Sequence, residues 1–145
     1  MVSGSGCPPH GALACVAMAL LAAAVAVRMF RSRVAEMREK RINPQKLANS
    51  IGIQANLQDV QAADNFRNLL EAPVLFYALC ALLIATGKAS LLFAAGAWIY
   101  VALRVAHSVI HCGYNRVMQR FYAYAASGAV LLKMWIGYGA VLLAA

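Results

Sequence analysis

The chain has 145 residues, of which 63% are hydrophobic and only 12% are charged, and its mean hydropathy is +0.66. A soluble domain is about half apolar and about a quarter charged. This composition argues against an ordinary soluble enzyme and indicates an integral membrane protein. The formal net charge is +8. Because the basic residues flank apolar runs, we interpret them as topology signals and contacts with anionic membrane lipids, not as a nucleic-acid site.

Four apolar runs follow one another along the chain, at about 11–30, 65–87, 89–112 and 121–143. As helices, with a rise of about 1.5 Å per residue, each can cross a hydrocarbon core of about 30 Å. Backbone groups in lipid must be hydrogen-bonded within the segment, which favours helices. No Lys or Arg precedes the first run, so it does not resemble a signal peptide. The sequence predicts one all-α domain over 1–145, an integral membrane four-helix bundle.

The connections between these runs differ in length. The second and third runs are joined by the turn Gly87-Lys88, which predicts an antiparallel helical hairpin, and the third and fourth by the short polar stretch 113–116. The connection 31–64 is long. It begins as a charged extension of the first helix, which Asn43-Pro44 should end. The stretch 45–63 is polar, and we expect it to be partly helical and able to fold over the bundle.

Basic residues are distributed unequally between the two sides. Lys88 and Lys133 belong to one side. The other eleven of the thirteen lie around the first and third connections: Arg28, Arg31, Arg33, Arg38, Lys40, Arg41, Lys46, Arg67, Arg104, Arg116 and Arg120. By the positive-inside rule, the side that carries these eleven basic residues is expected to be cytoplasmic. With four spans, both termini are then expected on the non-cytoplasmic side.

Polar residues on the second run share one helix face. They are spaced three, four and seven residues apart: Asp64, Arg67, Asn68 and Glu71. One interpretation is an interfacial cap with an Arg67–Glu71 ion pair. However, Glu71 leads directly into the apolar stretch 72–76, and a carboxylate at that depth usually marks a functional site. Pro73 should also loosen the helix and free a carbonyl one turn earlier.

The third and fourth runs carry further polar faces at the same end. The third has Arg104, His107, Ser108 and His111 on one face, and the fourth has Arg116, Arg120 and Tyr124 at intervals of four. Several guanidinium groups with one carboxylate are not self-neutralised, so this cluster should attract an anion. A carboxylate, a phosphate and a lipid headgroup all remain possible from the chemistry alone.

A metal site is not expected. His107 and His111 are four residues apart on a helix, but no further ligand falls at their depth and their neighbours are cationic. The spacings of the four cysteines match no zinc or redox motif. Cys15, Cys80 and Cys112 lie in apolar runs, where we expect free thiols that pack as small hydrophobic groups.

Two motifs resemble those of a known family. Residues 67–71, RNLLE, followed by an apolar helix with a proline, resemble the helix-two motif of the MAPEG family, the membrane-associated proteins of eicosanoid and glutathione metabolism. Residues 104–109, RVAHSV, are similar to the helix-three motif of microsomal prostaglandin E synthase and the microsomal glutathione transferases. The resemblance covers about 64–127 and looks closest to bacterial members. It implies a multi-pass protein of the bacterial inner membrane.

The resemblance also implies a homotrimer that binds glutathione between subunits near the cytoplasmic face. Arg120 corresponds to the family's arginine that stabilises the glutathione thiolate, which would make it the catalytic residue. Arg33 or Arg38 could supply the family's helix-one arginine. The remaining candidate binding residues are Arg67, Asn68, Glu71, Arg104, His107, His111, Arg116 and Tyr124.

Three positions depart from prostaglandin E synthase: Phe121 replaces a serine, His111 a tyrosine and Asp64 an arginine. Prostaglandin synthesis is therefore not predicted. The leading hypothesis is a glutathione-dependent transferase, peroxidase or isomerase that acts on lipophilic electrophiles dissolved in the membrane. The alternative is a non-catalytic protein of the same fold that binds lipid or glutathione. An ion channel fits less well, since no ladder of charges crosses the midplane.

Overall fold

The computed structural model describes residues 10–58 and 60–144. These residues form helices joined by turns and short loops. Four of these helical segments are long and apolar enough to cross a membrane: Gly11–Glu39, Gln61–Ala85, Leu91–Cys112 and Val117–Leu143. The protein is an all-α membrane-type four-helix bundle. Its elements are α1 (His10–Glu39), the 3-10 helix η1 (Pro44–Leu47), α2 (Ser50–Asn56), α3 (Gln61–Glu71), α4 (Pro73–Ala85), α5 (Leu91–Cys112) and α6 (Val117–Leu143).

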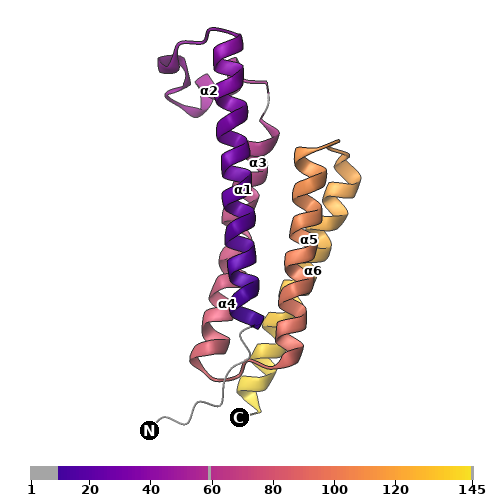
Figure 1. The fold of residues 1–145 in the computed structure, drawn as a ribbon. Helices are drawn as coiled ribbons and strands as arrows, with labels where there is room; N and C mark the ends of the chain where they lie inside the picture. The colour runs from indigo at the N-terminus through magenta and orange to yellow at the C-terminus, as the bar shows by residue number, and fades with distance from the viewer. Residues whose placement is uncertain (1–9, 59, 145) are drawn as a thin grey trace.

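Helix α5 packs against α1, α3 and α6. In Figure 1, α1 stands in front of α3 and α4, and α5 and α6 run side by side next to them. The start of α1 and the end of α6 lie at one end of the bundle. The end of α1, the start of α3, the end of α5 and the start of α6 lie toward the other, which we call the basic end. Most arginines and lysines belong to it.

The second span is divided at Ala72. Helix α3 ends at Glu71 and α4 begins at Pro73, while Ala72 keeps helical dihedral angles (φ −71°, ψ −38°). The chain therefore continues in the same direction, but the ring of Pro73 cannot donate a hydrogen bond to the preceding turn. At the far end of α4, Gly87 adopts a positive φ of 65°, and the N–H of Lys88 donates to the carbonyl of Leu83 at 3.1 Å. This arrangement ends the helix and reverses the chain into α5.

The long connection folds beside the end of α1. The side chain of Asn43 accepts a hydrogen bond from the N–H of Gln45 and begins η1, and Asn49 caps α2 through the N–H of Gly52. The N–H of Gln58 donates to Glu36 Oε1 at 2.7 Å, which fixes the connection to α1. Helix α2 lies next to the end of α1 and not over α5 and α6 (Figure 1). It therefore leaves the ends of α5 and α6 uncovered.

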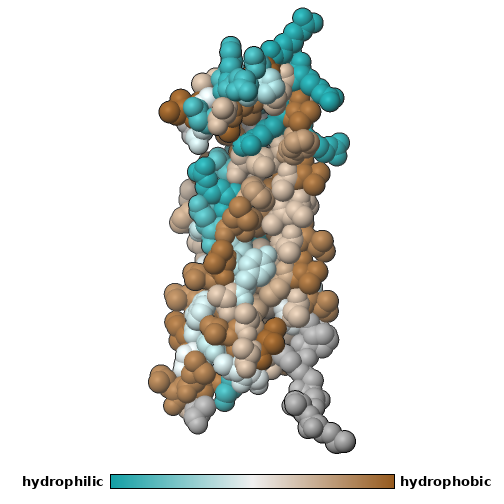
Figure 2. All heavy atoms as spheres, turned by 90° about the vertical axis from the view of Figure 1, so that its left-hand side faces the viewer, coloured by the Kyte–Doolittle hydropathy of each residue, from teal (hydrophilic) through white to brown (hydrophobic). Residues whose placement is uncertain are grey.

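The core of the bundle is thin, and much of the apolar surface faces outward. Phe76 on α4 stacks on Tyr100 on α5, with ring centroids 4.7 Å apart, and both side chains are fully buried. By contrast, α1 and α6 are mostly exposed. Of the 18 consecutive residues that form the most apolar part of each helix, only 17% in α1 and 22% in α6 are buried. Figure 2 shows apolar atoms over most of the height of one face, with hydrophilic atoms gathered toward the basic end. This distribution suits a protein surrounded by lipid.

We predict that Phe76→Ala destabilises the bundle, because it removes the ring stacked on Tyr100 and leaves a cavity. The free energy of unfolding in detergent should fall by roughly 3 kcal/mol, as for aromatic truncations in other packed interiors. Val74→Ala, at an exposed position on the same helix, serves as the control and should change stability little. Equal losses for the two variants, measured by thermal or denaturant unfolding, would contradict this packing.

Candidate functional site

A cavity of about 290 Å³ opens at the basic end between α3, α5 and α6. Four of the candidate binding residues and the candidate catalytic residue line it. Its walls are formed by Asp64, Asn68, His107, His111, Val117, Arg120, Phe121 and Tyr124. Three helices therefore converge as the spacings predicted, and both a carboxylate and a guanidinium face the same space.

The turn between α5 and α6 holds Arg120 in place. Asn115 adopts a positive φ of 48°, a conformation that asparagine tolerates better than most residues, and its N–H donates to the carbonyl of Ile110 at 2.8 Å. Its side-chain oxygen Oδ1 then accepts a hydrogen bond from Arg120 Nη1 at 2.9 Å. Arg120 is thus positioned by a neutral amide, so its positive charge is not cancelled within this contact.

Arg104 lies beneath the cavity and is almost completely buried, with 1% of its surface exposed. Its Nε donates to the hydroxyl of Tyr100 at 3.2 Å. The guanidinium carbon lies 4.8 Å from the ring centroid of Tyr124 and 5.4 Å from that of Tyr100. Its Nη1 has no hydrogen-bond partner, and the one ion pair among the described residues joins Lys40 to Glu36 instead. A buried guanidinium without a carboxylate strongly favours the binding of an anion.

The two histidines complete the inner wall of the cavity. His107 Nδ1 lies 3.1 Å from the carbonyl oxygen of Arg120, and because a carbonyl can only accept, this nitrogen carries the proton. His107 Nε2 and His111 Nδ1 are buried and have no partner. The rings contact each other edge to face at 5.4 Å, and His107 also contacts Tyr124. Unpartnered buried nitrogens beside a cavity are available to hydrogen-bond a ligand.

A buried polar contact that the sequence did not indicate links α3 to α5 next to the cavity-lining residues Asp64 and His111. Asn65 is fully buried, accepts from the hydroxyl of Ser108 at 3.4 Å and donates to the sulfur of Cys112 at 3.4 Å. It lies one residue after Asp64, on the inward face of α3. In the sequence, Asn65 stands out only as an amide at the start of an apolar run. This does not show which face of the helix points into the bundle.

Besides Arg104, three candidate binding residues do not line the cavity. Arg67 and Glu71 are exposed on α3 and form no ion pair with each other, and Arg116 is exposed at the start of α6. Arg67 instead lines a smaller cavity of about 170 Å³, together with Arg33 of α1 and Asp64. Because Asp64 lines both cavities, the two spaces adjoin. One copy of the chain therefore brings together only part of the predicted residue set.

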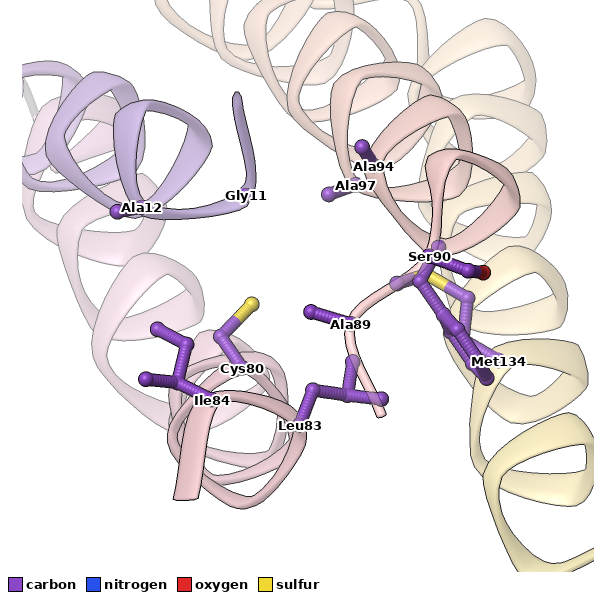
Figure 3. Close-up of a pocket in the computed structure, with 11 residues that line it drawn as sticks. Gly11, Ala12, Cys80, Leu83, Ile84, Ala89, Ser90, Ala94, Ala97 and Met134 are labelled. Carbon is purple, nitrogen blue, oxygen red and sulfur yellow. The ribbon is translucent and has the colours of Figure 1, made fainter. Parts of the chain in front are cut away.

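The opposite end of the bundle contains a cavity of different character, about 200 Å³ in volume. Small and apolar side chains from α1, α4, α5 and α6 form most of its walls, and the sulfur of Cys80 points into it (Figure 3). Among the described residues, no charged side chain lines it. A polar, charged ligand would lose its hydration there without compensation, so this cavity does not suit the predicted anion.

Comparison with protein families gives one result, a match of the MAPEG family to residues 11–140. The chain belongs to the MAPEG family. The match extends over all four spans, well beyond the motifs at 67–71 and 104–109. Comparison with curated proteins and comparison with solved structures each give no match. As a MAPEG protein, the chain is a multi-pass membrane protein of a family that is generally associated with glutathione.

We predict that Arg104→Met stabilises this MAPEG protein in the absence of ligand, because it removes a buried charge that has no counterion. The gain in the free energy of unfolding should be about 1 kcal/mol or more. The same variant should lose stabilisation by an anionic ligand such as glutathione. Arg116→Met, which replaces an exposed guanidinium, is the control and should leave unliganded stability unchanged. A loss of stability in Arg104→Met would mean that Arg104 is already neutralised in the free protein.

Proposed function

We propose that the protein is a glutathione-dependent membrane enzyme, a transferase, peroxidase or isomerase acting on lipophilic electrophiles. The observation that carries the proposal is the unpaired guanidinium of Arg104 next to a cavity lined by Arg120 and two histidines. Glutathione is an anionic tripeptide with two carboxylates, and guanidinium groups suit carboxylates. Membership of the MAPEG family supports this choice of ligand.

The residues at the site divide into binding and activating groups. Asn68, His107, His111 and Tyr124 line the cavity and would orient the tripeptide, while Arg104 would balance its charge from below. Arg33, which lines the adjoining cavity with Arg67, is the better placed of the two helix-one arginines. Fixing the ligand in this way contributes the orientation part of catalysis.

Arg120 is the proposed catalytic residue. When bound, glutathione supplies a thiol, whose deprotonated form is the nucleophile. A guanidinium held by the neutral side chain of Asn115 is not neutralised in that contact, and its positive charge favours the thiolate over the thiol. Phe121, the next residue, lines the same cavity. It would place an apolar surface beside the nucleophile, where a lipophilic substrate can enter from the membrane.

The positions of the remaining residues support a homotrimer. The cavity of about 290 Å³ lies at the lower limit of small-molecule sites, which span roughly 300–1,000 Å³. Arg67 and Glu71 are exposed outside it, on an outward face of α3. A carboxylate at this depth is unfavourable when it faces lipid. We therefore propose that a neighbouring copy covers this face and that the tripeptide lies between two copies, on the cytoplasmic side.

Glutathione should stabilise the detergent-solubilised protein against thermal unfolding. At a concentration about ten times the Kd, the expected stabilisation is about 1.4 kcal/mol. S-Methylglutathione, which keeps both carboxylates but has no free thiol, should stabilise it comparably if charge dominates binding. If neither compound raises the unfolding temperature at millimolar concentration, the result would favour the alternative of a lipid-binding protein that does not use glutathione.

Replacing Arg120 should affect catalysis more than binding. For Arg120→Ala we expect kcat for conjugation of glutathione to a lipophilic electrophile to fall by about a hundredfold, as when one stabilising donor is removed from other active sites. Arg120→Lys should recover part of this loss because it retains the charge. Lys133→Ala, an exposed position in the other half of α6, is the control. Unchanged activity in Arg120→Ala would remove the catalytic role from this residue.

A further inference from the structure

A groove runs along α1 where this helix faces the end of α5. Two adjoining cavities form it, with volumes of about 330 Å³ and 580 Å³, and Ala24 and Arg28 line both. The lower cavity is lined by Leu21, Ala24, Val25, Arg28, Ser108, Val109, Cys112 and Gly113, and the upper one by Ala24, Val27, Arg28, Arg31, Ser32 and Ala35. None of these residues lines the proposed glutathione cavity.

The groove changes character along its length. Its α1 wall repeats at intervals of three and four residues, so it follows one face of the helix. Below Arg28 this face is apolar, with Leu21 and Val25 opposite Val109 of α5. From Arg28 onward it carries two guanidinium groups and a hydroxyl. The groove is therefore apolar at one end and basic at the other.

The change coincides with the end of a membrane span. Arg28 Nη2 donates to the carbonyl oxygen of Cys112, the last residue of α5, at 2.5 Å. Helix α5 has 22 residues and is thus about 33 Å long, close to the thickness of a hydrocarbon core of about 30 Å. Arg28 therefore lies near the membrane boundary. Arg31 and Ser32 continue past the end of α5 on α1, at the depth of lipid headgroups.

The basic part of the groove has no counterion within the described residues. Arg28 and Arg31 are exposed, and the one ion pair in this part of the chain is Lys40–Glu36. The hydroxyl oxygen of Ser32 is buried and has no hydrogen-bond partner. Two guanidinium groups and a free hydroxyl are suitable ligands for a phosphate.

We propose that this groove binds an anionic phospholipid, with its phosphate at Arg28, Arg31 and Ser32 and one acyl chain along Leu21, Val25 and Val109. Charge complementarity selects the headgroup, because two guanidinium groups without a counterion among the described residues favour a net negative lipid over a zwitterionic one. The apolar part of the groove distinguishes a lipid from a free phosphate, which would leave it empty. The site lies on the α1 side of α5 and is independent of glutathione binding.

Native mass spectrometry of the full-length protein tests this proposal. The protein is released from detergent containing equal amounts of phosphatidylglycerol and phosphatidylcholine with identical acyl chains. The wild type should retain phosphatidylglycerol at least fivefold more than phosphatidylcholine. Arg31→Gln and Ser32→Ala should each reduce this preference, and Ala24→Leu, which fills the point shared by the two cavities, should abolish retention of both lipids. Equal retention of the two lipids by the wild type would overturn the proposal.

Matched variants separate a defined site from general surface charge. Arg38→Gln removes an exposed arginine outside the groove, and Ala23→Leu adds the same bulk at an exposed neighbouring position; neither should change lipid retention. If Arg38→Gln reduces the preference as much as Arg31→Gln, the groove is not the site. Displacement of the lipid by millimolar inorganic phosphate would identify a free-anion site instead. If Ala24→Leu changes the oligomeric mass and leaves lipid retention intact, a second copy of the chain occupies the groove.

Discussion

The charged end of the bundle is organised around Arg104, whose guanidinium is removed from solvent by the surrounding helices, and no carboxylate of the described residues neutralises it. A buried charge is unfavourable unless another group balances it. Here the protein supplies one tyrosine hydroxyl and the faces of two aromatic rings, which interact with a cation more weakly than a carboxylate does. The fold thus maintains an unbalanced positive charge next to a cavity, and the arrival of an anion would remove the imbalance.

Helix α5 separates two kinds of chemistry along one span. Near the basic end it presents Arg104, His107 and His111 to the site, and all three are buried. Near its start it contributes Ala94 and Ala97 to the apolar cavity shown in Figure 3. Between them, Tyr100 links the core to the charged end, because its ring stacks on Phe76 and its hydroxyl accepts from Arg104. The rigid packing of the middle of the bundle therefore also fixes the position of the charge.

Much of the fold could be predicted from the sequence, since apolar runs of about 20 residues have few alternatives to spanning helices. The break before Pro73 followed from the chemistry of proline, and the polar face of α5 followed from helical periodicity. The direction in which each face of α3 points could not be predicted in this way. Periodicity identified a face with Arg67 and Glu71 but could not show that it turns outward while Asn65 turns inward. That choice depends on packing between helices, and in an assembly it also depends on neighbouring copies.

The division of the second span at Ala72 weakens the connection between two parts of one helix. The segment before the break carries Asn68 at the site, and the segment after it carries Phe76 in the core. Because Pro73 interrupts the hydrogen-bond ladder between them, a change in the packing of α4 is transmitted only weakly to α3. A substitution that repacks Phe76 should therefore leave the position of Asn68 in the wall of the candidate site largely unchanged.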